Sequence, residues 1–162
     1  MSEEPAVSAD ADRPNRWPWP PILYAVMPIA TFALGRLVPL DWLPEGMALR
    51  GIGGVLAVLG IGIAAAAIFR FRALGTPVDP TGRPTALSTG GIYRFTRNPM
   101  YLGAVVMFAG IALALRSSWL LLLVPALAIL LEHLAIRREE AYLERRFGEA
   151  YRAYKARVRR WV

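Results

Sequence analysis

Cysteine is absent from this sequence of 162 residues, and histidine occurs once, as His133. Without cysteine the chain forms no disulfide and has neither a thiolate nucleophile nor a thiolate metal ligand. One imidazole is also too few for a histidine-based metal cluster. We therefore expect chemistry that uses neither a thiol nor a bound metal ion.

The first sixteen residues lack the charge pattern of a cleavable signal peptide, which begins with a basic segment. Four acidic residues stand there instead: Glu3, Glu4, Asp10 and Asp12. The segment has no apolar period, so we expect residues 1–16 to be a disordered tail. Residues 17–162 are then expected to form a single domain.

Charge is also missing from long internal stretches. Residues 51–69 are nineteen positions without a charged side chain, and a helix of about 20 apolar residues crosses a bilayer. Three further apolar spans cover residues 22–40, 99–115 and 117–131. Hydrophobic residues make up 56% of the chain and the mean hydropathy is +0.38. The expected fold class is all-α, an integral membrane protein with about four transmembrane helices.

The segment after the fourth span is charged and amphipathic. Its apolar residues recur at three- and four-residue spacing: Leu143, Phe147, Tyr151, Tyr154 and Val158. This spacing predicts a helix with one apolar face, broken near Gly148. We expect this helix and the long loop 70–97 to cap the membrane helices at one end.

The formal net charge is +7, and the basic residues are unevenly distributed. They concentrate in the loop 70–97 and in residues 132–162, whereas the opposite loops hold Arg50 and Arg116. The positive-inside rule then places the long loop and both termini in the cytoplasm. Basic loops beside anionic lipid explain the charge without a nucleic-acid partner. We expect an integral membrane protein, in the inner membrane of a bacterium.

A polar motif, "GIYRFTRNPMYLG" at residues 91–103, stands at the start of the third span. Asn98 is a good N-cap and Pro99 suits the first helical position. The helix start carries partial positive charge, and Arg94 and Arg97 would make it a site for a carboxylate or phosphate. Gly103, one turn later, would let another group approach the backbone. The alternative is a capped helix start with basic interfacial anchors.

A second polar motif, "EHLAIRREEAYL" at residues 132–143, follows the fourth span and lies on the same side of the membrane. Glu139 and Glu140 would face the arginines of the first motif. A site with arginines on one side and carboxylates on the other suits a ligand that has an anionic end and also hydroxyl or cationic groups. The alternative is a solvated helix face whose carboxylates pair with neighbouring arginines.

Together the two motifs resemble the superfamily of isoprenylcysteine carboxyl methyltransferases and phospholipid methyltransferases. The resemblance covers about residues 70–162 and rests on two blocks. The first block matches at Gly91, Tyr93, Arg94, Arg97, Pro99, Tyr101 and Gly103. The second block matches at Glu139, Glu140, Leu143, Phe147, Gly148, Tyr151, Tyr154, Val158, Arg160 and Trp161. These small integral-membrane enzymes use S-adenosylmethionine, and the resemblance implies the same cofactor here.

The resemblance also implies site residues. Cofactor-binding residues would be Tyr93, Arg94, Arg97, Asn98, Pro99, Tyr101, Gly103, Glu139 and Glu140, and catalytic residues Arg97, Glu140 and His133. The family often has His where this chain has Asn98. Asparagine still forms hydrogen bonds, but it cannot transfer a proton near neutral pH.

The expected methyl acceptor is lipophilic and enters from the bilayer. A carboxylate acceptor needs no base, whereas a phospholipid amine must first lose a proton, for which His133 and Glu132 are candidates. Residues 74–80, "LGTPVDP", are either a turn or a lid over the cofactor. Two other functions stay open: a membrane reductase of the sterol-reductase type with a nicotinamide cofactor, and a non-enzymatic scaffold. The oligomeric state stays open too.

Overall fold

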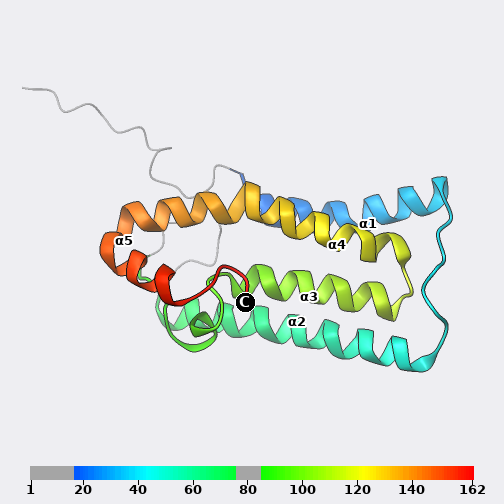
Figure 1. Ribbon diagram of the computed structural model, residues 1–162, viewed down its shortest axis with the longest axis horizontal. Coiled ribbons are helices and arrows are strands. Elements are labelled where there is room, and N and C mark those ends of the chain that lie inside the picture. The colour runs from blue at the N-terminus through cyan, green and yellow to red at the C-terminus, as the bar shows by residue number, and fades with distance from the viewer. Residues whose placement is uncertain (1–16, 76–84) are drawn as a thin grey trace, which may run out of the picture.

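The computed structural model describes residues 17–75 and 85–162, and every regular element in these ranges is helical (Figure 1). The elements are α1 (Trp19–Leu37), α2 (Met47–Ala73), η1 (Gly91–Arg94), α3 (Pro99–Ala114), α4 (Ser118–Leu131), η2 (Glu132–Ile136) and α5 (Arg137–Arg157). The short element η1 is a 3-10 helix and η2 is a π-helix. The predicted tail, residues 1–16, and most of "LGTPVDP" lie outside the described residues.

Three helical stretches are long and apolar enough to cross a bilayer. They are α1, α2 and the continuous stretch Ser118–Arg157, which begins with α4. The remaining apolar helix, α3, is shorter, with 16 residues. The all-helical, integral-membrane fold class is therefore confirmed. Helix α2 is longer than its uncharged span because its hydrogen bonding continues through Arg50 and Arg70 at the two ends.

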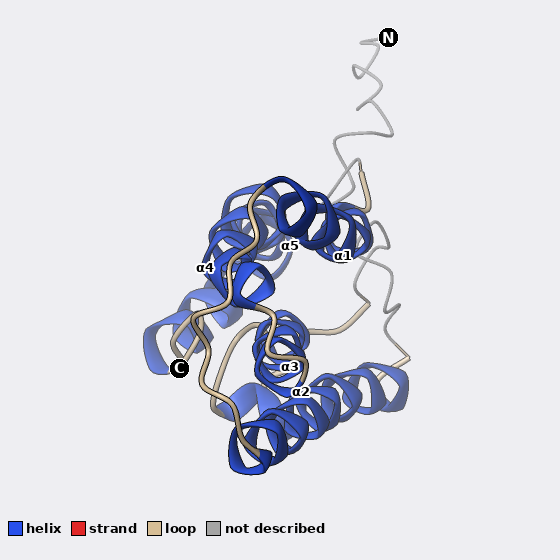
Figure 2. Cartoon of the chain, turned by 90° about the vertical axis from the view of Figure 1, so that its right-hand side faces the viewer, coloured by secondary structure: helices blue, strands red, loops and turns tan. Residues whose placement is uncertain are grey.

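The helices form two layers, with α1 beside α4 in one and α2 beside α3 in the other (Figures 1 and 2). Glycines allow α2 and α3 to pack closely. A Cβ added at Gly103 would lie 2.6 Å from the Gly60 carbonyl oxygen, and one at Gly110 would lie 2.6 Å from that of Gly53. Such distances are too short for any side chain, so the backbones pack directly against each other.

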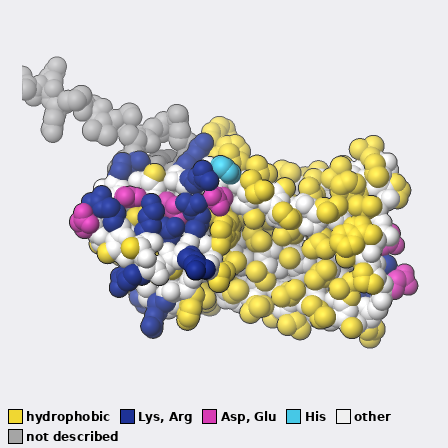
Figure 3. Space-filling view, viewed as in Figure 1, with side chains coloured by type: hydrophobic (Ala, Val, Ile, Leu, Met, Phe, Trp, Pro, Cys, Tyr) yellow, Lys and Arg dark blue, Asp and Glu magenta, His cyan; other side chains and the backbone are white. Residues whose placement is uncertain are grey.

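Charged side chains gather at one end of the molecule, around α5, while the rest of the visible face is mostly apolar (Figure 3). We call this end, formed by η1, α5 and residues 158–162, the charged end. Large apolar side chains such as Ile29, Phe32, Val55 and Val58 are exposed along α1 and α2. Exposed apolar surface on helices of this length is expected where lipid tails are the solvent.

Helix α5 turns sharply at Gly148, where φ is 51° and ψ is −123°. A positive φ of this kind is readily adopted by glycine, so the predicted break is confirmed. After the turn, Tyr151 and Tyr154 are buried against Tyr93 of η1. The Tyr154 hydroxyl donates a hydrogen bond to the Tyr93 carbonyl oxygen at 2.7 Å. The turn thereby folds the end of α5 back over the start of α3.

Candidate functional site

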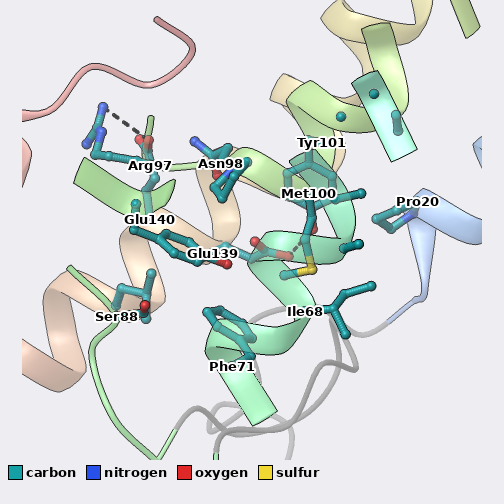
Figure 4. Close-up of a pocket in the computed structure, with 18 of the residues that line it drawn as sticks. Pro20, Ile68, Phe71, Ser88, Arg97, Asn98, Met100, Tyr101, Glu139 and Glu140 are labelled. Carbon is teal, nitrogen blue, oxygen red and sulfur yellow. Dashed lines mark hydrogen bonds and ion pairs between the residues drawn. The ribbon is translucent and has the colours of Figure 1, made fainter. Parts of the chain in front are cut away.

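A cavity of about 520 Å³ lies beside the charged end, between α1, α2, α3 and α5. Pro20 of α1 and Ile68 and Phe71 of α2 line it (Figure 4). Tyr24 of α1 lines it as well. The start of α3 and the first turn of α5 supply the polar part of the wall. The cavity therefore has a polar end and an apolar end.

Arg97 and Glu140 meet at the polar end. The Arg97 Nη2 atom lies 3.2 Å from Glu140 Oε1, and the two side chains are only 8% and 7% exposed (Figure 4). The Arg97 backbone N–H donates to the Arg159 carbonyl oxygen at 3.0 Å, which fixes the residue just before α3. An ion pair buried this deeply requires further hydrogen bonds to offset its loss of water.

Several buried polar atoms in this wall have no hydrogen-bond partner among the described residues. They are Nε and Nη1 of Arg97, the hydroxyls of Tyr93 and Tyr142, and Oγ of Ser88. All four residues line the cavity. Burial raises the pKa of Tyr93 far above its usual range, so this hydroxyl stays protonated and remains a donor. Buried donors without partners are costly, and a polar ligand in the cavity would satisfy them.

Glu139 and Tyr101 meet on the apolar side of this wall. The Tyr101 hydroxyl donates a hydrogen bond to Glu139 Oε1. Ile68 of α2 lies on the same side of the cavity (Figure 4), and Ala64 of α2 and Met107 of α3 add further apolar lining. The structure thus gives the adjacent carboxylates different surroundings, because Glu140 meets arginine and Glu139 meets a tyrosine hydroxyl.

The structure brings together most of the residues that the sequence predicts for the site. The predicted residues that line the cavity are Tyr93, Arg97, Asn98, Pro99, Tyr101, Gly103, Glu139 and Glu140. Arg94 and His133 are not among them, and both are exposed. Arg94 ends the 3-10 turn η1, and His133 lies on the π-helix η2. Gly103 also faces α2, where its lack of a side chain permits helix packing.

Glu132, a candidate base from the sequence, lies just beyond the end of α4 and is occupied by other groups. Trp161 Nε1 donates to its Oε2 at 3.1 Å, and Arg137 and Arg160 both bind its Oε1. The hydrogen bonds from Trp161 and Arg137 lower the pKa of Glu132. A lower pKa makes this carboxylate a weaker proton acceptor, and the residue does not line the cavity.

Sequence reasoning missed three contributors to the site. Ser88 and Tyr24 come from segments without a motif, and no signal in the sequence indicates that they reach the cavity. Arg160 belongs to the second block of the family resemblance, but its partners are 20 and 28 residues away along the chain. Its place in the second block, which also contains Glu139 and Glu140, was the available signal.

No group of three or more histidine, cysteine, aspartate or glutamate side chains that could hold a metal ion occurs among residues 17–75 and 85–162. The donor set of the cavity is instead suited to an organic ligand. An arginine with two unused N–H groups can bind a carboxylate, hydroxyl groups can bind polar atoms, and the apolar end can hold a hydrocarbon.

Comparison with known proteins identifies the family of this chain. Residues 49–150, more than half of the chain, match the family model described as phospholipid methyltransferase. An uncharacterized protein of Haemophilus influenzae is 40% identical over 63 residues, which is 39% of this chain and the whole of that protein. The matched family residues contain all but the first two residues of α2, the whole of α3 and α4, and both cavity carboxylates. The chain therefore belongs to the phospholipid methyltransferase family, whose members are membrane methyltransferases.

Proposed function

We propose that the protein transfers a methyl group from S-adenosylmethionine to a lipophilic acceptor at the cytoplasmic face of a membrane. The observation that carries this proposal is the cavity itself. One end has buried donors without partners, on Arg97, Tyr93 and Tyr142, and the other end is apolar. A polar cofactor and a lipophilic acceptor need these two environments side by side.

At the polar end, Arg97 would bind the carboxylate of the cofactor through Nε and Nη1, the two groups that Glu140 leaves unused. The start of α3, immediately after Asn98, adds the partial positive charge of a helix N-terminus. Glu140 would accept a hydrogen bond from the amino group or from a ribose hydroxyl. Tyr93 and Tyr142 would donate to further polar atoms. When bound, the cofactor supplies an electrophilic methyl carbon.

At the apolar end, the acceptor would enter from the bilayer between α1 and α2. Pro20 and Tyr24 line this side from α1, and Ile61 and Ala64 line the other from α2. Positioning of the acceptor is then the main contribution of the protein to the rate, because methyl transfer needs alignment rather than a covalent intermediate. The excess of lysine and arginine at the charged end (Figure 3) supports a cytoplasmic orientation of that end.

Among the two acceptor classes, the cavity favours an amine. Among the described lining residues, Arg97 supplies the positive charge, and it is already bound to Glu140. The carboxylate nearest the apolar end is Glu139, which would repel an acidic acceptor and attract an ammonium group. Glu139 would also accept the proton that an amine must lose, a role that the exposed His133 is poorly placed to fill.

Calorimetry on the protein in mild detergent, with S-adenosylmethionine as the ligand, tests the cofactor assignment. We expect wild-type binding and a loss of at least about tenfold in affinity for Arg97→Ala, since a hydrogen-bonded charge pair contributes about 1.5–3 kcal/mol. Arg138→Gln is the matched control, because Arg138 is exposed and immediately precedes Glu139. Arg94→Ala tests a residue that the sequence predicts to bind the cofactor but that does not line the cavity. We expect a smaller loss of affinity than for Arg97→Ala.

Two further results would contradict the proposal. A folded wild-type protein that does not bind the cofactor in detergent or in lipid would refute the assignment. Competition by a nicotinamide dinucleotide at the same site would favour a reductase.

If the cofactor binds, incubation of membranes with methyl-labelled cofactor identifies the acceptor. Label in an amine-containing lipid is expected, whereas label released from a methyl ester by mild base would favour a carboxylate.

A further inference from the structure

The last residues of the chain form a strap across the start of α3. We call residues 158–162 the C-terminal strap. Its backbone accepts three hydrogen bonds from the segment that leads into α3. Arg97 N–H donates to the Arg159 carbonyl, and the Thr96 hydroxyl and Asn98 Nδ2 both donate to the Arg160 carbonyl. Thr96 and Asn98 are buried, so these contacts hold the strap in one position.

From this position the Arg160 side chain contacts Glu140, a residue of the cavity wall, without lining the cavity itself. Its Nε lies 3.1 Å from Oε1 of Glu140, and its Nη2 lies 2.7 Å from Oε2. Its third nitrogen, Nη1, lies 2.7 Å from Oε1 of Glu132. The guanidinium therefore binds Glu140 through two parallel contacts and is itself anchored by a second carboxylate. These pairings raise the pKa of Arg160, with the Glu140 hydrogen bond as the main cause.

Glu140 is consequently shared by two arginines in unequal ways. Arg160 binds both of its oxygens, whereas Arg97 binds one oxygen through Nη2 alone. The remaining groups of Arg97, Nε and Nη1, are buried and have no partner among the described residues. A carboxylate held by one arginine alone would favour a parallel two-bond pairing with it. The contact with Arg160 removes that option and leaves Arg97 incompletely paired.

We propose that Arg160 is a positioning residue that keeps Arg97 available for the carboxylate of the cofactor. Arg160 does not line the cavity. It acts through Glu140, by occupying both oxygens and by offsetting the negative charge beside the incoming anion. Arg97, Arg137 and Arg160 together with Glu132 and Glu140 carry one net positive charge, whereas the same cluster without Arg160 would be neutral. This inference rests on the proposed function, because it assigns a carboxylate ligand to Arg97.

The test compares two probes that differ in one group. S-adenosylmethionine and its decarboxylated form, which lacks only the carboxylate, are titrated into the full-length protein in detergent. We expect the wild type to prefer S-adenosylmethionine by at least about tenfold. In Arg160→Gln this preference is expected to fall to within about threefold, while the affinity for the decarboxylated probe changes little. Arg159→Gln is the control, because it removes an exposed charge from the same strap.

The outcomes separate the inference from the proposed function. If the wild type binds neither probe, the proposed function fails. If the wild type binds both probes equally, or if Arg160→Gln keeps the wild-type preference, the positioning role is wrong. An equal loss of both probes in Arg160→Gln would show a merely structural role and would also overturn it. Arg160→Lys provides a second variant if Arg160→Gln unfolds, because it keeps the charge and loses the two-bond geometry. Its preference for S-adenosylmethionine over the decarboxylated probe is expected to be intermediate. A preference equal to that of the wild type would contradict the proposal.

Discussion

The side-chain amide of Asn98 donates a hydrogen bond of 3.1 Å to the backbone carbonyl of Arg160, 62 residues further along the chain. Asn98 is the N-cap residue of α3, as the sequence predicts, and Pro99 occupies the first turn. Its side chain nevertheless forms no hydrogen bond to the helix. The residue that ordinarily caps its own helix here holds the C-terminal strap in place.

Replacing Asn98 by aspartate should therefore weaken the attachment of the strap, which the Arg97 N–H and the Thr96 hydroxyl also hold. Near neutral pH an aspartate side chain has no hydrogen-bond donor, and its oxygen would face the Arg160 carbonyl oxygen. We expect Asn98→Asp to lower the free energy of unfolding by about 1–3 kcal/mol, measured by thermal unfolding in detergent. Asn98→His keeps an N–H donor and should retain most of the stability. Equal losses in the two variants would argue against the strap contact. This donor role also gives a physical reason why histidine and asparagine are both compatible with the motif.

Gly103 should be required for the packing of α2 against α3. A methyl group there would meet the Gly60 carbonyl oxygen at 2.6 Å and Ala64 N at 2.8 Å. Both are backbone atoms that cannot move alone, so Gly103→Ala should destabilise the protein by about 1–3 kcal/mol. Gly62→Ala is the control, since a Cβ at Gly62 meets no atom within 4 Å. The thermal midpoint of each variant measures the effect. A loss for Gly62→Ala as large as that for Gly103→Ala would contradict the packing argument.

Arg116 joins the two loops at the end of the molecule opposite the charged end. Its side chain is 17% exposed and donates to the Leu43 carbonyl at 2.9 Å, with Asp41 and Glu45 as ion-pair partners. Its φ is 53°, a conformation that costs energy for a residue with a Cβ. These contacts offset the strain and connect the ends of α1 and α2 to the turn before α4.

Arg116→Ala should lower the free energy of unfolding by about 1–2 kcal/mol through the lost, partly buried hydrogen bond to the Leu43 carbonyl. Glu45→Gln should cost less than about 0.5 kcal/mol, because Glu45 is exposed and such pairs are screened by water. Neither change should alter cofactor affinity, since both residues are remote from the cavity. A weakened affinity in a folded Arg116→Ala variant would indicate coupling between the two ends.

Much of the architecture follows from the sequence by itself. Uncharged runs of bilayer length determine the membrane helices, because a lipid environment requires internal hydrogen bonding. Gly148 determines the turn in α5, because its positive φ is readily adopted by glycine. The two motifs determine which residues meet at the charged end, because adjoining membrane helices return them to the same side. The prediction that an arginine faces the paired glutamates depends only on this return of the chain to the same side of the membrane.

Only the tertiary structure decides the individual roles. Arg94 and Arg97 stand three residues apart in one motif, yet only Arg97 lines the cavity, because the 3-10 turn η1 leaves Arg94 exposed. The π-helix η2 likewise leaves His133 exposed. Arg160 binds Glu140 because the Gly148 turn and the hydrogen bonds of the strap bring the chain back to α3. Side-chain direction and contacts between distant segments depend on how the helices pack, and the linear pattern of residues does not encode that packing explicitly.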